Sequence, residues 1–166
     1  MKVFAIDPGN TQSAYCVMTD DFQLLEFAKL PNAECMAKML KWLDKIESVV
    51  IERVASYGLA VGKEVFETCE WIGRFTQEAS HVVNVEYVFR KDEKVYLCND
   101  MRAKDSNIRQ ALIDRFARFD FKSGRGTKAN PDYFYGVKAD CWAAIAVATT
   151  FYDMRINKKL KEEKHV

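Results

Sequence analysis

The sequence opens with MKVFAIDPGNTQSAYCV, residues 1–17, and this stretch decides which fold is expected. An apolar run at residues 3–6 ends abruptly at Asp7, a Pro-Gly-Asn turn sequence follows, and a second strand-like run begins at Ser13. Asp7 has two interpretations. It is either a turn residue that caps backbone amides, or it ends a buried central strand and presents its carboxylate to an open site at the sheet edge.

Length and cysteine content narrow the class of protein. A chain of 166 residues suggests one domain, which would bury roughly 70% of its unfolded surface. The five cysteines form neither a CxxC motif nor a Cys/His cluster, so we expect buried free thiols rather than disulfides or a zinc site. The early acid at Asp7 argues against a signal sequence, and no uncharged apolar stretch is long enough to span a bilayer. These features predict a cytoplasmic protein.

The pattern of apolar residues predicts alternating strands and helices after an initial three-stranded meander. Strands are expected at residues 2–6, 13–18, 22–29, 48–51 and 82–89, and helices at residues 33–46, 63–79, 103–119 and 137–155. The segment EKVYLCND, residues 93–100, is expected to be a short strand or extended. Residues 122–135 are expected to form a polar loop, whose composition is also typical of mobile loops. The strand at 48–51 is apolar on both faces, which places it inside the sheet. The order of elements predicts a three-layer α/β domain with a mixed five-stranded sheet and helices on both faces.

Positive charge is concentrated in two regions although the net charge is only +1. The segment from Arg102 to Lys128 contains eight basic residues and three acids, and the segment from Arg155 onward contains five basic residues and two acids. A local positive field raises the affinity for polyanions. The second region is also typical of a frayed, solvated C-terminus, which is the interpretation preferred for residues 157–166.

Two further acids interrupt apolar segments as Asp7 does. Glu52 directly follows the strand SVVI, and Asp140 lies in the first turn of the helix expected at 137–155. Singly, each has an ordinary structural explanation, because strand ends and helix N-termini tolerate acids. Together, three carboxylates at the ends of buried elements would repel one another and need a cation. All-oxygen sites favour hard divalent ions such as Mg²⁺, and two ions roughly 4 Å apart can clamp a phosphodiester during hydrolysis.

Three motifs in this order, IDPGNTQSAY, VVIERVASYG and KADCWAAIAVA, resemble the RuvC Holliday-junction resolvases of the RNase H-like superfamily, in the shorter form carried by phages. The segments GKEVFETCEWIGRF and MRAKDSNIRQALIDRF resemble that family's helix after the second acid and its basic region. The resemblance implies an RNase H-like nuclease domain over residues 1–156, followed by a basic tail at 157–166. It also implies that Asp7, Glu52 and Asp140 are the catalytic metal ligands.

The family usually carries a fourth acid three residues before the last one, and here that position is Val137. Asp132, in the loop upstream, is an alternative ligand, although its Asn-Pro-Asp setting is ordinary turn chemistry. Residues three apart on a helix share a face. An acid introduced at position 137 is therefore expected to point into the same site as Asp140.

The resemblance also suggests residues that contact DNA. Arg102 and Lys104 fall where the family has basic residues near its active-site groove. Tyr57, just after Glu52, is a candidate for stacking at an opened junction, or else it packs its loop over the next helix. Lys138 is either a phosphate ligand or a solvated lysine.

The function implied is metal-dependent resolution of branched DNA, with Mg²⁺ or Mn²⁺ as cofactor and a homodimer that makes two symmetric incisions. Two alternatives stay open. Val137 is consistent with a DNA-binding protein of impaired catalysis. The Asp-x-Gly-x-Thr pattern, residues 7–11, also occurs in sugar-kinase and actin-like ATPases, but the second Gly-rich phosphate loop of such enzymes is not found in the sequence.

Overall fold

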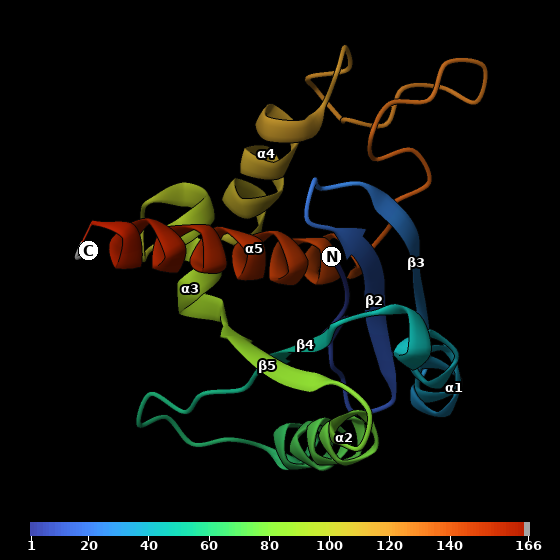
Figure 1. Ribbon diagram of the computed structural model, residues 1–166, viewed down its shortest axis with the longest axis vertical. Helices are drawn as coiled ribbons and strands as arrows, with labels where there is room; N and C mark the ends of the chain where they lie inside the picture. Colours follow the sequence, from blue (N-terminus) through green and yellow to red (C-terminus); the bar gives the residue numbers. More distant parts are fainter. Residues whose placement is uncertain (165–166) are drawn as a thin grey trace.

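A mixed five-stranded sheet forms the centre of the molecule, seen in the computed structural model, which describes residues 1–164 (Figure 1). The strand order is β3-β2-β1-β4-β5. The strands are β1 (Lys2–Asp7), β2 (Gln12–Thr19), β3 (Leu24–Pro31), β4 (Ser48–Arg53) and β5 (Asn84–Phe89). The meander β1, β2 and β3 is antiparallel, whereas β4 and β5 run parallel to β1. The predicted α/β fold with a mixed five-stranded sheet is therefore confirmed.

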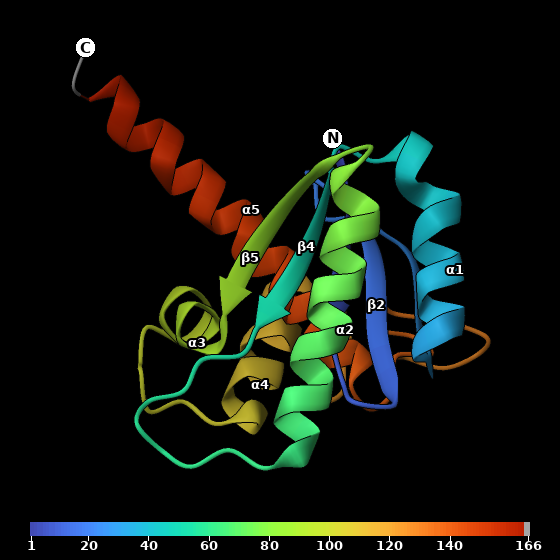
Figure 2. The ribbon, with the colours of Figure 1, turned by 90° about the horizontal axis from the view of Figure 1, so that it is seen from below.

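Helices cover both faces of the sheet, as Figures 1 and 2 show. One face carries α1 (Asn32–Trp42), a 3₁₀ turn (Leu43–Lys45) and α2 (Lys63–Ser80). The other face carries α5 (Cys141–Glu163), flanked by α3 (Arg90–Cys98) and α4 (Asp105–Phe116). Two apolar clusters result, because successive side chains of a strand point to opposite faces. In β1, Phe4 and Ile6 pack toward α1 and α2, while Val3 and Ala5 pack toward α5.

Helix α3 replaces the strand or extended segment expected at residues 93–100, and that expectation is wrong. The helix begins directly after β5, where the Asp92 carboxylate accepts a hydrogen bond of 2.9 Å from the Phe89 backbone N–H. It ends at Asn99, which adopts the left-handed conformation with φ of 51°. Such N-terminal acids and a C-terminal Asn are helix-boundary signals that outweigh the local β propensity of Val95 and Tyr96.

Helix α5 is displaced by several residues from its predicted position. It begins at Cys141 rather than at residue 137, and it continues as far as Glu163. Gly136, with φ of 79°, lies in the turn before it, and Val137 is fully buried. The segment expected to fray after residue 156 is thus helical through Glu163. The tail residues 165–166, including His165, lie outside the described residues.

The loop between α4 and α5 is organised around a buried carboxylate acceptor, Asp132. Asp132 is 5% exposed and accepts backbone hydrogen bonds from Arg118, Phe119, Asp120 and Tyr133. These bonds substitute for secondary structure, because they satisfy backbone donors that have no helix or strand partner. The segment is therefore fixed at several points, unlike the mobile loop that its polar composition suggests.

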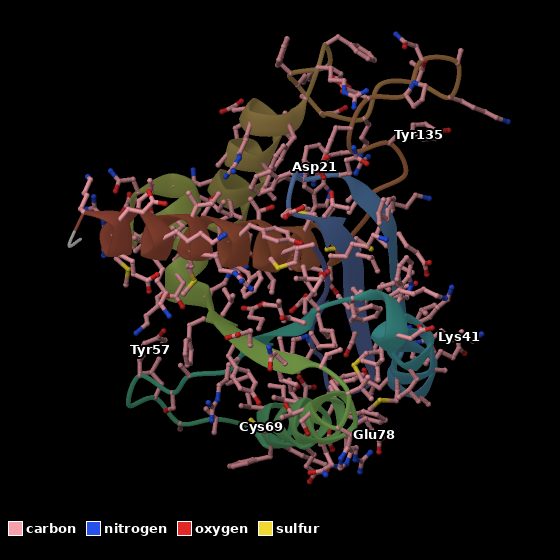
Figure 3. The ribbon with its side chains drawn as sticks, viewed as in Figure 1. Asp21, Lys41, Tyr57, Cys69, Glu78 and Tyr135 are labelled. Carbon is pink, nitrogen blue, oxygen red and sulfur yellow. The ribbon has the colours of Figure 1, made fainter. Side chains whose placement is uncertain are left out.

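All five cysteines are free, but only Cys16, Cys35 and Cys141 are buried. Cys69 on α2 is exposed (Figure 3). Cys98 is partly exposed, so the expectation of uniformly buried thiols is wrong for these two residues. None of the helices within residues 1–164 is both long and apolar enough to cross a membrane.

Candidate active site

Two carboxylates meet where the central parallel strands end. Strands β1 and β4 are paired in parallel with Ile6 opposite Ile51, so Asp7 and Glu52 are the next residues of the two strands. Side-chain alternation directs both toward the α5 face, because Ala5 and Val50, two residues earlier, pack in that cluster. The two carboxyl groups are close enough to share a hydrogen bond. The sequence-based prediction that these acids meet is consistent with this arrangement.

The environment makes it costly for both carboxyls to ionise together. Burial is the main reason that the pKa of Asp7 is raised to about 8, followed by repulsion from Glu52, the hydrogen bond with Glu52 and a smaller effect of Asp140. Burial also raises the pKa of Glu52, against the nearby charge of Arg90. Two carboxyls that share a proton in this way are a pair that a bound cation would stabilise.

Asp140 lies at the same edge but has a different partner. It is the residue before the first turn of α5, its side chain is exposed, and it does not cap that helix. Its carboxylate instead forms an ion pair with Lys29 of β3. Within residues 1–164, no three His, Cys, Asp or Glu side chains are arranged so that they could hold a metal ion. The fold thus joins Asp7 to Glu52 and leaves Asp140 nearby, paired with Lys29.

Two residues of α3 that the sequence analysis missed complete this edge. Arg90 forms ion pairs with Glu93 and Asp105, and its charge acts on both Asp7 and Glu52. Glu93 is fully buried, and one of its carboxyl oxygens has no hydrogen-bond partner. Burial, followed by repulsion from Glu52, raises the pKa of Glu93 to about 9. Arg90 comes directly after β5, and Asp7 and Glu52 likewise lie at the ends of β1 and β4. This shared placement at strand ends was the sequence signal that could have identified Arg90.

Neither candidate for a fourth acid position belongs to the site. Val137 lies before α5 rather than one turn upstream of Asp140 on the same helix, and it packs in the apolar cluster beneath α5. The expectation that an acid at position 137 would point into the site is therefore wrong. Asp132 is engaged by four backbone donors of its own loop, so it serves that loop rather than a metal.

The residues proposed to contact DNA are exposed but differ in setting. Arg102 donates to Asp100 over 3.4 Å and is otherwise solvent-exposed, while Lys104 immediately precedes α4. Tyr57 is 66% exposed on the loop between β4 and α2, so it is not packed over that helix (Figure 3). Lys138 is exposed two residues before Asp140. Figure 2 shows the loop that carries Tyr57 at the edge where β4 and β5 end.

Solved structures of Holliday-junction resolvases share this fold. Thermus thermophilus RuvC in complex with Holliday junction substrate has a TM-score of 0.61 and 18% identity, covering 95% of this chain and 96% of that chain. A second Thermus thermophilus RuvC structure has a TM-score of 0.59, 18% identity, and coverage of 95% and 97%. The Fowlpox virus resolvase in complex with substrate Holliday junction DNA has a TM-score of 0.52 and 12% identity, with coverage of 93% and 98%.

Sequence comparison gives no further relatives, since no family model and no curated protein sequence matches the chain. The structural likeness nevertheless extends over nearly the whole chain and over nearly the whole of each resolvase. The protein therefore shares the fold of the RuvC structures, as the sequence motifs predicted.

Proposed function

We propose that this protein is a metal-dependent, structure-selective endodeoxyribonuclease that resolves Holliday junctions and other branched DNA by paired phosphodiester hydrolysis. The observation that carries the proposal is the Asp7–Glu52 pair at the ends of two adjacent parallel strands, within a resolvase-type fold. Ligand sites of α/β sheets lie at the carboxyl ends of the strands. Two of the similar structures are complexes with junction DNA, which favours a branched substrate.

The residues present fit a hard divalent cation. Asp7 and Glu52 supply only oxygen ligands. Burial raises the pKa of both carboxyls, and repulsion from Glu52 raises that of Asp7 further. They would hold Mg²⁺ or Mn²⁺, and Asp140 would join them after release from Lys29. A bound ion of this kind polarises the phosphoryl oxygen and lowers the pKa of a water molecule.

The other charged residues at this edge would organise the reaction. Asp7 has to lose the proton that it shares with Glu52 before both can act as ligands. Lys29, once separated from Asp140, would be free to contact a DNA phosphate. Arg90 is fixed by Glu93 and Asp105, and it offsets part of the negative charge that Glu52 and Asp7 bring together.

A homodimer is part of the proposal. Symmetric incision of a four-way junction requires two active sites related by a two-fold axis, and one copy of this chain supplies one such site. Each copy would cut one strand and leave 5′-phosphate and 3′-hydroxyl ends.

The experiment that tests the proposal compares a labelled four-way junction with a linear duplex of matching sequence, in Mg²⁺, Mn²⁺ or EDTA. We expect cleavage of the junction only with metal. Asp7→Asn, Glu52→Gln and Asp140→Asn should each lower the cleavage rate by at least about 100-fold, since each removes a charged ligand. Junction binding should stay within about threefold of the parent, since these acids do not position the DNA. Asp114→Asn, at an exposed acid on α4, is the matched control and should cleave normally.

A second candidate function is junction binding without catalysis on the same fold. It is favoured by the Lys29–Asp140 ion pair and by Val137 at the usual position of the fourth acid. The same assay separates the two functions. Tight junction binding with no cleavage in either metal would establish the binding protein and reject the nuclease.

A further inference from the structure

A surface cavity of about 350 Å³ adjoins the acidic edge, between the start of α4 and the start of α5. Its lining includes Arg90, Ser106, Arg109, Leu112, Asp140 and Trp142. Pockets of this volume accommodate small ligands or parts of larger ones. None of the residues predicted from the sequence to contact DNA lines this cavity, so it is a feature separate from that set.

Arg109 is the one side chain of the cavity whose charge is uncompensated within residues 1–164. Each acid in the lining has a cationic partner in this structure, Arg90 for Asp105 and Lys29 for Asp140. Arg109 makes neither an ion pair nor a side-chain hydrogen bond there, and its guanidinium carbon lies 4.4 Å from the centre of the Trp142 ring. Stacking restricts the guanidinium group without using its N–H donors. Those donors remain available for a phosphate, which an arginine can bind through two parallel hydrogen bonds.

Two helix N-termini border the same cavity. Ser106 belongs to the first turn of α4, and Trp142 to the first turn of α5. At α4 the Lys104 side chain has no acceptor, although the Asn107 side chain accepts a hydrogen bond of 2.9 Å from the Lys104 backbone N–H. At α5 the Asp140 carboxylate does not cap the helix and is paired with Lys29. In α5 the first N–H groups are already used, since Cys141, Trp142 and Ala143 donate to backbone carbonyls of the preceding turn. The first turn of α4 is therefore the one whose backbone N–H groups and positive dipole end can face an anion.

Trp142, another residue of the lining, carries a buried hydrogen-bond donor without a partner in residues 1–164. It is only 7% exposed, and its indole N–H has no hydrogen-bond partner among the described residues. A buried polar group is normally satisfied, and leaving it unsatisfied costs about 1 to 3 kcal/mol. The neighbouring Ala139, also in the lining, has a positive φ of 45°, which is strained for alanine and marks the turn as specifically shaped.

We propose that this cavity binds a backbone phosphate of the DNA strand next to the phosphodiester that is cut, with Arg109 as its principal cation. This inference rests on the proposed function, because the substrate is taken to be DNA. The ligand chemistry is a phosphate group flanked by sugar and base. The apolar wall formed by Ile108 and Leu112 suits the uncharged part of a nucleotide.

The test is fluorescence anisotropy of a fluorescein-labelled four-way junction in EDTA, over a series of salt concentrations. Arg109→Gln should weaken binding roughly tenfold and reduce the slope of log K against log salt by about one, as loss of one phosphate contact predicts. Arg109→Lys keeps the charge but loses the planar fork, so a smaller loss of roughly threefold is expected. Arg74→Gln is the matched control, since Arg74 stacks on Trp71 at 4.5 Å but lies on α2. It should bind as the parent does.

Equal salt slopes for Arg109→Gln and the parent would overturn the inference. If inorganic phosphate displaces the junction from the parent but the salt slope does not depend on Arg109, the cavity is a free-phosphate site and the DNA assignment is wrong. If Arg109→Gln fails to fold by circular dichroism, Arg109→Lys takes its place, and parental affinity in that variant overturns the proposal. Because these measurements need no cleavage, a parent that binds but never cuts rejects the nuclease activity alone. If the parent does not bind the junction, a short labelled single-stranded oligodeoxynucleotide takes its place, and equal salt slopes for Arg109→Gln and the parent on that probe overturn the inference.

Discussion

Val137 stands where the resolvase resemblance leads one to expect an acid, and the fold gives this side chain an apolar role. It is fully buried in the cluster between the sheet and α5, and its backbone N–H donates to Phe134 over 3.0 Å. A valine here is therefore part of the core. The position has no access to the carboxylate pair without a rearrangement of the turn that precedes α5.

This placement predicts that Val137→Asp destabilises the protein instead of improving its use of metal. A carboxylate buried without a partner costs roughly 3 to 5 kcal/mol. The free energy of unfolding, measured by urea denaturation, should fall by that amount, while Val54→Asp, at a valine that is 38% exposed, should change it little. A Val137→Asp protein of parental stability that needs less Mg²⁺ would contradict this placement.

The site residues differ in how well the sequence predicts them. Asp7 and Glu52 could be paired from sequence because each ends an apolar run, and parallel strands bring such positions to one edge. Arg90 also follows a strand, but the segment after it was expected to be extended. The sequence therefore did not predict α3, the helix that places Arg90 beside the two acids. The burial of Glu93 depends on the packing of α3 against α5, which local sequence does not encode.

Among the elements, the loop between α4 and α5 shows how order can arise without apolar periodicity. Asp132 gathers the backbone N–H groups of three consecutive residues, and Asp120 similarly binds Ser123, Arg125 and Gly126. From sequence, such a stretch is polar and rich in turn residues, which also describes a mobile loop. Only the tertiary contacts distinguish the two cases, whereas the long amphipathic helices are predicted well by their periodicity.

This loop predicts a specific acid sensitivity. Burial acts to raise the pKa of Asp132, but the backbone donors of Asp120, Arg118, Phe119 and Tyr133 outweigh it and lower the pKa to about 2. Since the unfolded value is about 3.9, Asp132 contributes stability above about pH 4 and loses it as the pH falls toward about 2. Asp132→Asn should lower the free energy of unfolding at pH 7 by about 2 kcal/mol. It should also flatten the fall in stability between about pH 4 and 2.

Urea unfolding midpoints across that pH range provide the measurement. Asp114→Asn, at an exposed acid, is the control and should keep the parental pH profile. An Asp132→Asn protein with the same acid profile as the parent would show that the loop is held by other contacts.

At the scale of the whole molecule, the last turns of α5 extend beyond the packed layers (Figure 2). Residues 157–163 are all exposed, and five basic residues lie between Arg155 and Lys164. The helix thus continues as a basic extension of the domain. The start and end of α5 were harder to predict than its existence. The exposed last turns lack an apolar face, and the apolar Val137 fits the pattern of a first helical residue although the helix begins at Cys141.

Deletion of residues 157–166 should consequently leave the core intact. We expect the melting temperature to fall by less than about 3 °C, which corresponds to roughly 1 kcal/mol for a domain of this size. The salt dependence of junction binding should become shallower if the extension contacts phosphates. Thermal unfolding by circular dichroism checks the first point, and a fall of more than about 10 °C would show that the extension supports the fold.

The central position of β1 has a consequence for how the protein opens. Residues 3–6 are fully buried and hydrogen-bonded on one side to β2 and on the other to β4. Their amide hydrogens can exchange with solvent only when the whole sheet comes apart, whereas β3 and β5 each have a free edge. In deuterium exchange, peptides from β1 should therefore be the slowest to label, at the rate of global unfolding. The turn that follows Asp7 should label much sooner, so that the acidic edge opens locally while the strand that carries Asp7 stays closed.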